Sequence, residues 1–134
     1  RKETLMEKIT FKNLIQTSRC IVLADGYYEW KREEKNKVPY YFTKENNELM
    51  FLAAIHQNNQ FCIITREATK EISEIHHREP LILNQGQINN FLNVKKNAME
   101  VLNSIKPPKL KFHEIKKDVN NPINNNSSLI NKLN

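Results

Sequence analysis

Glycine and cysteine are scarce in this sequence, with 2 residues of each among 134. A collagen needs glycine at every third position, and a small disulfide scaffold needs many more cysteines, so both classes are excluded. The apolar runs fall well short of the roughly 18 residues that a membrane-spanning helix requires. The first residues, RKETLMEKITFKN, are charged and contain no apolar segment of the signal-peptide type. We therefore expect no membrane partner.

Charged residues, by contrast, make up 27% of the sequence, and the positive ones are in excess. Lys and Arg number 21 against 15 Asp and Glu, which gives a net charge of +6 at pH 7. A basic chain of this length, about one domain's worth, suits a polyanion such as nucleic acid. Many basic domains nevertheless bind nothing acidic, so charge alone leaves the partner open.

The two cysteines, Cys20 and Cys62, each lie inside an apolar run. We expect both to be buried free thiols, as is usual in the reducing cytoplasm. The adjacent His76 and His77 point apart on a helix, and the sequence contains no CxxC or HxxxH spacing. The pattern therefore predicts no metal site, and we expect no cofactor.

Hydrophobic periodicity predicts a helix, a series of strands, short helices and a last strand. Helices are expected over 3–18, 67–76, 84–94 and 96–105, and the clearest strands over 19–24, 38–43, 49–55, 61–66 and 110–116. The strands 38–43 and 49–55 are expected to form a hairpin, and 31–37 a solvated turn or loop. The continuous apolar run at 61–66 predicts burial on both faces. The order indicates an α+β fold with a curled, barrel-like, mixed or antiparallel sheet.

The segment DGYYEWK (25–31) is the first candidate site. Because glycine is so rare here, Gly26 between Asp25 and three aromatic residues indicates a special backbone position. Glu29 lies between Tyr28 and Trp30, and a carboxylate partly withdrawn from water by aromatic rings suits acid–base chemistry. The alternative is an exposed glutamate on the polar face of a strand.

Two further segments carry polar side chains at the ends of apolar runs. In IHHREP (75–80), a histidine could act as a general acid or base and Arg78 could hold a phosphate, or the segment could be only a polar loop. The pair Thr65-Arg66 ends a strand, where the hydroxyl and the guanidinium could bind a phosphate, or Thr65 could serve structure alone. The pair Asn121-Pro122 is assigned to a turn.

Taken together, these segments resemble one family. RCIVLADGYYEWK (19–31) is similar to the block R-C-[LI]-x-P-A-D-G-[FY]-[YF]-E-W, and IHHREPLIL (75–83) to I-H-[DN]-R-M-P-[VL]-[IV]-L. FLAAI (51–55), Ile64-Thr65 and VNNP (119–122) match further blocks in the same order. The resemblance is to the SOS-response-associated peptidase family, or SRAP domain. Leu23, His77 and Glu79 depart from the family's usual residues.

The resemblance implies an activity on abasic sites in single-stranded DNA, within the response to DNA damage. In the family, an N-terminal cysteine joins its amine and thiol to the sugar aldehyde as a thiazolidine cross-link, and the same cysteine serves in autoproteolysis. By this resemblance Glu29 handles protons during imine formation and His76 assists opening of the sugar ring. Arg1, Thr65 and Arg78 match positions that hold DNA phosphates.

Arg1 to Thr4 resemble the end of the family block N-A-R-x-E-T, whose Asn and the more distant catalytic cysteine are not in this sequence. We therefore expect residues 1–134 to be the C-terminal majority of one SRAP domain without its first strands, inactive alone, with a flexible tail over 123–134. One alternative is a non-catalytic module that binds single-stranded DNA. Another is a cysteine hydrolase that uses Cys62. The oligomeric state stays open.

Overall fold

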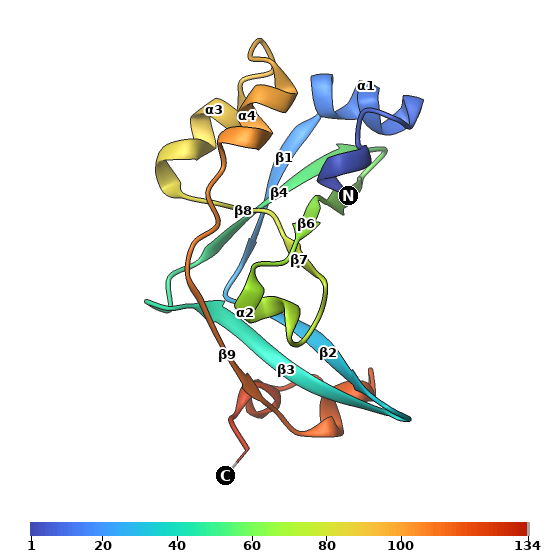
Figure 1. Cartoon of the computed structure of the whole chain (residues 1–134), viewed down its shortest axis with the longest axis vertical. Helices are drawn as coiled ribbons and strands as arrows, with labels where there is room; N and C mark the ends of the chain where they lie inside the picture. Colours follow the sequence, from blue (N-terminus) through green and yellow to red (C-terminus); the bar gives the residue numbers. More distant parts are fainter. Residues whose placement is uncertain (134) are drawn as a thin grey trace.

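Two antiparallel sheets lie one beyond the other along the long axis of the molecule, with helices at one end (Figure 1). The computed structural model describes residues 1–133. Between the sheets lies a short two-stranded ribbon that carries one small helix (Figure 1). The predicted α+β class is therefore confirmed.

The upper sheet is built on a buried central strand. It contains β1 (Arg19–Ala24), β4 (Met50–Gln57), β5 (Gln60–Ile63) and β8 (Ile82–Leu83). β4 pairs with the other three strands, all antiparallel. Because partners surround β4, its residues from Leu52 to Ile55 are buried, which explains its continuous apolar sequence.

The lower sheet is a hairpin joined by a late strand. β2 (Tyr27–Glu33) pairs with β3 (Asn36–Lys44), which in turn pairs with β9 (Leu110–Glu114). The solvated turn predicted over 31–37 is present but shorter, since strand pairing continues to the outermost pair, Glu33 and Asn36. Only two residues turn the chain, and Glu34 adopts a φ of 48° to do so.

The central ribbon pairs β6 (Thr65–Glu67) with β7 (Arg78–Pro80). The helix expected over 67–76 is reduced to α2 (Lys70–Ser73), because Glu67 belongs to β6 and the chain beyond α2 turns back toward β7. Glu67 pairs with Arg78, and the Ala68 N–H donates to the His77 carbonyl at 3.0 Å. The ribbon thus brings the segments 65–67 and 76–80 side by side.

Two predictions about strand partners are wrong. The strands expected to form a hairpin, β3 and β4, lie in different sheets, because β3 is already paired on both sides by β2 and β9. The segment 61–66 is not buried on both faces, since it splits into β5 and β6. β5 is an edge strand on which Phe61 is 60% exposed.

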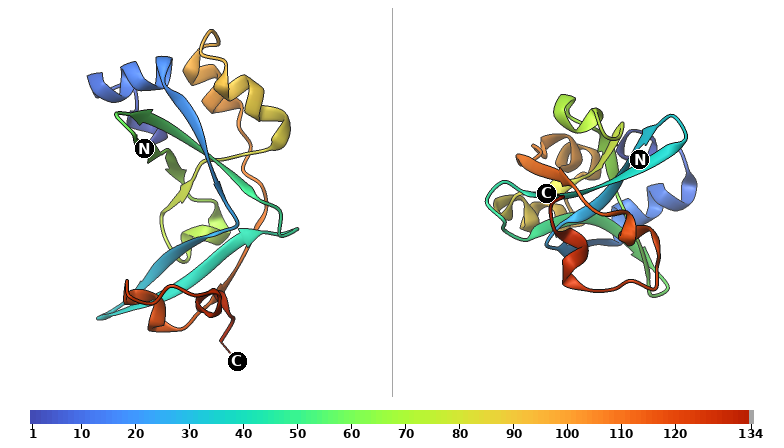
Figure 2. Two further views of the ribbon diagram at one scale, coloured as in Figure 1. Left: turned by 180° about the vertical axis from the view of Figure 1, so that it is seen from behind. Right: turned by 90° about the horizontal axis from the view of Figure 1, so that it is seen from below.

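The sheets do not close into a barrel, which corrects the barrel-like expectation (Figure 2). The chain passes from the upper sheet to the lower one at Gly26, between β1 and β2. A side chain there would collide with the Phe42 carbonyl oxygen and the Tyr41 ring. Glycine is therefore required for close approach, and the special backbone position predicted for Gly26 is confirmed.

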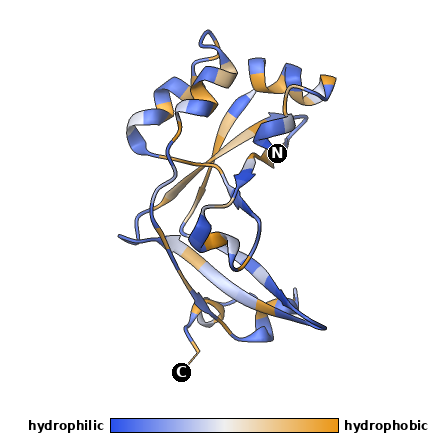
Figure 3. Cartoon of the chain, viewed as in Figure 1, coloured by the Kyte–Doolittle hydropathy of each residue, from blue (hydrophilic) through white to orange (hydrophobic). Residues whose placement is uncertain are grey.

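Helices cover the upper sheet. They are η1 (Lys2–Thr4), α1 (Ile9–Thr17), η2 (Gln85–Gln87), α3 (Ile88–Leu92) and α4 (Ala98–Ser104). Apolar colour gathers where these helices meet the upper strands, whereas the β2–β3 tip is hydrophilic (Figure 3). Ile15, Phe91 and Leu102 are fully buried there. Each helix in residues 1–133 is too short or too polar to cross a bilayer.

Arg19 joins two of these helices. Its guanidinium, buried to 7% exposure, donates to the carbonyl oxygens of Ile15, Phe91, Asn93 and Lys96 at 2.6–3.1 Å. These carbonyls lie near the C-terminal ends of α1 and α3, where helical hydrogen bonds run out. Arg19, the first residue of the matched block 19–31, therefore has a structural role, which is to hold the ends of α1 and α3 together.

The C-terminal residues fold back on the lower sheet through η3 (Lys117–Asn120) and η4 (Ser127–Ile130). Leu129 is buried, and His113 Nε2 lies 2.8 Å from the Ile130 carbonyl oxygen. The flexibility expected for 123–134 stays a prediction, and residue 134 lies outside the described residues.

Candidate functional site

A cleft of about 660 Å³ opens along the free edge of β2. Three segments far apart in the sequence line it, namely the β2–β3 hairpin, the segment that follows α2, and η3 with the residues after it. Its lining residues are Glu29, Trp30, Arg32, Lys37, His76, Val119, Asn120 and Pro122. The two predicted catalytic residues, Glu29 and His76, are therefore in one cleft.

Glu29 and His76 face each other in this cleft. Glu29 Oε2 lies 3.6 Å from His76 Nδ1, and both side chains are partly exposed, at 26% and 32%. The other carboxylate oxygen, Oε1, accepts the N–H of Trp30 at 3.0 Å. That N–H belongs to the open edge of β2, so the hydrogen bond turns the carboxylate toward the cleft. The pair is close enough to share a proton through a substrate or a water.

His76 is held where its ring nitrogen finds a partner in either protonation state. Nδ1 lies 3.1 Å from both the N–H and the carbonyl oxygen of Arg78. A neutral Nδ1 can accept from the N–H, and a protonated Nδ1 can donate to the carbonyl or to Glu29. The backbone places His76 by hydrogen bonding its N–H to the Ile72 carbonyl at 3.1 Å, at the end of α2.

The indole of Trp30 is fixed by the C-terminal segment. Its Nε1 donates to Asn120 Oδ1 at 2.6 Å. Sequence reasoning from spacing assigns this segment to a turn and misses Asn120. The signal that could have found it is the match of VNNP (119–122) to a family block. Arg32 and Lys37 are missed too, because their stretch is predicted to be only a solvated turn or loop.

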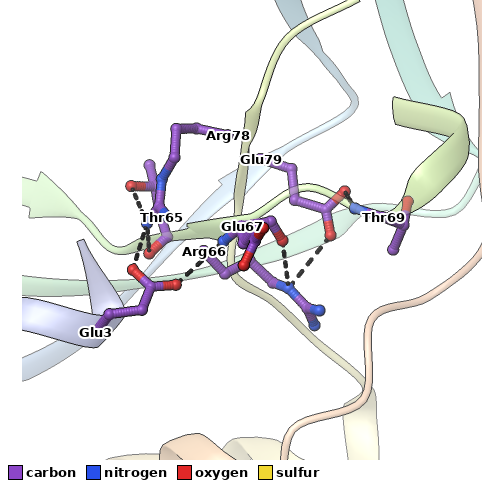
Figure 4. Close-up of polar contacts among 7 residues, drawn as sticks. All are labelled: Glu3, Thr65, Arg66, Glu67, Thr69, Arg78 and Glu79. Atoms are coloured by element: carbon purple, nitrogen blue, oxygen red, sulfur yellow. Dashed lines mark hydrogen bonds and ion pairs between the residues drawn. The ribbon is translucent and has the colours of Figure 1, made fainter. Parts of the chain in front are cut away.

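A second polar cluster lies on the central ribbon (Figure 4). Arg78 Nη2 donates to Glu3 Oε2 at 2.8 Å and to the Thr65 carbonyl at 2.9 Å, with the Thr65 hydroxyl at 3.3 Å. Glu3 also accepts the N–H of Glu67 at 3.1 Å. Burial opposes ionisation of Glu3, but hydrogen bonds from Arg78 and from backbone N–H groups outweigh it and hold the pKa of Glu3 at about 2.

The structure thus groups Thr65 and Arg78 and separates Arg1 from the cleft. Arg1 is exposed and directly precedes η1, the turn that carries Glu3. Arg78 connects the two clusters, because its backbone contacts His76 while its side chain reaches Thr65. The phosphate-binding roles of Arg1, Thr65 and Arg78 stay predictions.

Glu79, which departs from the family pattern, is almost fully buried at 3% exposure. Its carboxylate pairs with Arg66 Nε at 3.4 Å and accepts the Thr69 N–H at 3.4 Å (Figure 4). Burial raises the pKa of Glu79, and the contacts from Thr69 and Arg66 offset that rise only in part. Burial likewise raises the pKa of Tyr27, with added repulsion from the Glu79 and Glu29 charges.

Neither cysteine lines the cleft. Cys20 is half-buried in β1, and burial raises the pKa of its thiol. The expectation of a buried thiol is wrong for Cys62, which is exposed on the edge strand β5. Within residues 1–133, no group of three or more His, Cys, Asp or Glu is placed to hold a metal ion.

Fold and cleft together define an α+β protein with a carboxylate–imidazole pair at an open sheet edge. A crystal structure of a protein from Bacteroides thetaiotaomicron has the same fold, with a TM-score of 0.88 and 27% identity over 99% of this chain and 64% of that one. A phage-related protein from Bordetella bronchiseptica, 24% identical over 88% of this chain and 63% of that one, also shares the fold, with a TM-score of 0.72.

The family model for the SOS response associated peptidase (SRAP) matches residues 1–122. The chain belongs to this family, which confirms the resemblance. Among curated relatives, the abasic site processing protein YedK of Escherichia coli is 31% identical over 97% of this chain. The abasic site processing protein YMR114C of Saccharomyces cerevisiae is 30% identical over 99%. This chain spans 64% and 40% of their respective lengths.

Proposed function

We propose that this chain takes part in processing abasic sites in single-stranded DNA, with Glu29 and His76 as its proton-handling pair. The observation that carries the proposal is the 3.6 Å approach of these two side chains in an open cleft. Relatives named abasic site processing proteins support the substrate class. The proposal places this role in the cytoplasm, within the response to DNA damage.

The chemistry needs proton transfer at two points. Opening of the abasic sugar ring breaks the bond between C1′ and the ring oxygen, which must gain a proton while the C1′ hydroxyl loses one. His76 suits this step, because Nδ1 can hold or release a proton. An amine then adds to the aldehyde and expels water, and Glu29 suits the proton transfers of that dehydration.

The nucleophile of the proposed reaction is an N-terminal cysteine supplied from outside these 134 residues. Its amine forms the imine, and its thiol then adds across the C=N bond, with sulfur joining carbon and the proton going to nitrogen. Cys20 and Cys62 lie in β1 and β5, away from the residues that line the cleft. The proposal extends to peptidase chemistry by the same cysteine.

In the proposed complex with single-stranded DNA, the residues that contact phosphates are Arg1, Thr65 and Arg78. Arg78 already pairs with Glu3 through Nη2, so a DNA phosphate would either compete with that carboxylate or bind the other N–H groups of the guanidinium. The Thr65 hydroxyl beside Arg78 would supply a second donor to the same phosphate.

The test joins the N-terminal segment of a longer relative, including its cysteine, to this chain and incubates both proteins with single-stranded DNA carrying an abasic site. We expect a covalent shift on a denaturing gel for the joined protein and none for the 134-residue chain. Glu29→Gln in the joined protein should slow cross-linking about 100-fold, the usual contribution of one acid–base group.

Glu33→Gln is the matched control, since Glu33 lies on the same strand and face but pairs with Lys31 outside the cleft. Its cross-linking rate should equal that of the parent protein. An unchanged rate in Glu29→Gln would remove Glu29 from the mechanism. Salt-dependent binding without any cross-link in the joined protein would favour a non-catalytic module that binds single-stranded DNA.

A further inference from the structure

Two positively charged side chains lie side by side in the cleft, beyond the Glu29–His76 pair. Arg32 of β2 lies directly opposite Lys37 of β3, and both line the cleft. Opposite residues of an antiparallel pair point to the same face, with Cβ atoms about 5 Å apart. Like charges in that arrangement destabilise a hairpin, so an anion between them would relieve a built-in repulsion.

Neither cation is neutralised within the described chain. The ion pairs of residues 1–133 join Lys31 with Glu33, Lys44 with Glu48, Arg66 with Glu79, Glu29 with His76, and Glu3 with Arg78. Arg32 and Lys37 take part in none of these pairs, and both are exposed. Their neighbour Glu33 points to the other face of the hairpin, where it pairs with Lys31.

The cation pair and the acid–base pair lie on opposite faces of β2. Trp30 and Arg32 share one face, since they are two residues apart, whereas Glu29 is on the other. The cleft therefore passes around the open edge of the strand. Along β2 the distance from Glu29 to Arg32 is about 10 Å, from the rise of about 3.3 Å per residue. Trp30, held by Asn120, stands between them.

We infer that Arg32 and Lys37 form a phosphate subsite for the backbone of single-stranded DNA, beyond Trp30 from the Glu29–His76 pair. The guanidinium can bind two phosphate oxygens in parallel, and the lysine adds a point charge. Such contacts orient the strand without reading its bases. This inference rests on the proposed function, because it names how the same cleft would hold the strand next to the abasic nucleotide.

The experiment measures the affinity of the 134-residue chain for a fluorescent single-stranded oligonucleotide without a lesion, by anisotropy, over about 50–200 mM salt. The double variant Arg32→Gln with Lys37→Gln should bind about tenfold more weakly at the lower salt. Its plot of log affinity against log salt should be shallower by about 0.7 for each phosphate that the variant no longer neutralises.

The control is Lys12→Gln with Lys95→Gln, which removes the same charge. Both lysines are exposed. Lys12 lies in α1 and Lys95 in the connection between α3 and α4, and these elements are at the end of the molecule away from the β2–β3 hairpin (Figure 1). The control should keep the salt slope of the parent chain. Because Arg32 and Lys37 repel each other, the melting temperature of the hairpin double variant should be unchanged or higher, which separates lost binding from lost folding.

Equal effects of the two double variants would overturn the subsite, since only net charge would then matter.

A second series with an abasic oligonucleotide separates the two proposals. Equal affinity for both oligonucleotides, with the slope change confined to the hairpin variant, would support the subsite and count against abasic-site recognition. Preference for the abasic strand with an unchanged slope would overturn the subsite alone. Absence of binding to either oligonucleotide would overturn both.

Discussion

Glu79 shows how one substitution is accommodated inside the architecture of a family. The family block carries methionine where this chain places a carboxylate at 3% exposure. Arg66 and the Thr69 N–H compensate the charge, yet burial still raises the pKa of Glu79. A buried ion pair is often no more stable than a well-packed apolar side chain of the same size. The buried charge of Glu79 therefore lowers the free energy of unfolding by an amount that depends on pH.

Replacing Glu79 by methionine should stabilise the protein by about 1 kcal/mol at pH 7. Because folding raises the pKa of Glu79, the folded state holds its proton more tightly than the unfolded state. Wild-type stability then falls as pH rises from the ordinary glutamate pKa of 4.5 through the raised one. Glu79→Met lacks this fall, so urea denaturation should show a larger gain at pH 7 than at pH 4.

Glu79→Gln is the control, since it keeps the shape of the side chain and removes its titration. It should also lack the fall with pH. A variant Glu79→Met that loses more stability at pH 7 than at pH 4 would contradict the prediction, because the pair with Arg66 would then be a net stabilising contact.

At the scale of elements, the join between β1 and β2 depends on a residue with no side chain. Gly26 lies against the Phe42 carbonyl and the Tyr41 ring, both on β3. The pairing of Tyr27 with Phe42 begins one residue later. Close approach at Gly26 therefore sets where β2 starts, and with it the position of Glu29 in the cleft.

Gly26→Ala should destabilise the fold by about 2–4 kcal/mol, because the carbonyl it meets is backbone and cannot move aside. The other glycine of the chain, Gly86, provides the comparison. A Cβ there meets nothing within 4 Å. Gly86→Ala should leave stability unchanged or raise it by about 0.5 kcal/mol. Thermal denaturation of both variants checks this, and equal losses would count against the role assigned to Gly26.

The sequence predicts the existence of most elements better than their partners. The strands 19–24, 38–43, 49–55 and 110–116 correspond to β1, β3, β4 and β9. Their apolar runs and alternation are local patterns, so these strands can be recognised without knowledge of the fold. The predicted hairpin of β3 with β4 is wrong because pairing is decided by burial across the whole chain, where β2 and β9 outcompete the nearest strand in sequence.

The same distinction holds for the candidate site. Glu29 and His76 are found from their sequence context, and the structure brings them together. Asn120, Arg32 and Lys37 are missed, because their importance comes from what lies opposite them. Asn120 is 90 residues from the indole it contacts, and no local pattern records that distance.

At the scale of the molecule, the cleft depends on the C-terminal segment lying against the β2–β3 hairpin. The hydrogen bond between Trp30 and Asn120 is the described side-chain link between the two within the cleft. Trp30 is the single tryptophan of the chain, so its fluorescence reports on this wall of the cleft alone.

Asn120→Ala should shift Trp30 emission and increase hydrogen exchange in residues 117–133, because the indole N–H loses its partner and the segment loses an anchor. The expected loss of overall stability is small, about 1 kcal/mol, as for one exposed hydrogen bond. Asn103→Ala, on the exposed face of α4, is the control and should leave the emission unchanged. Unchanged emission in Asn120→Ala would show that other contacts hold the indole.

Local sequence patterns predict the α+β class, contain the family blocks, indicate an unusual backbone position at Gly26 and mark Glu29 and His76 as candidates. Each of these depends on residue type and on neighbours a few positions away. Packing of the whole chain leaves the sheets open, closes the space around Gly26, places Arg66 against Glu79 and sets Arg32 opposite Lys37. Those contacts depend on which surfaces are buried together when the whole chain packs.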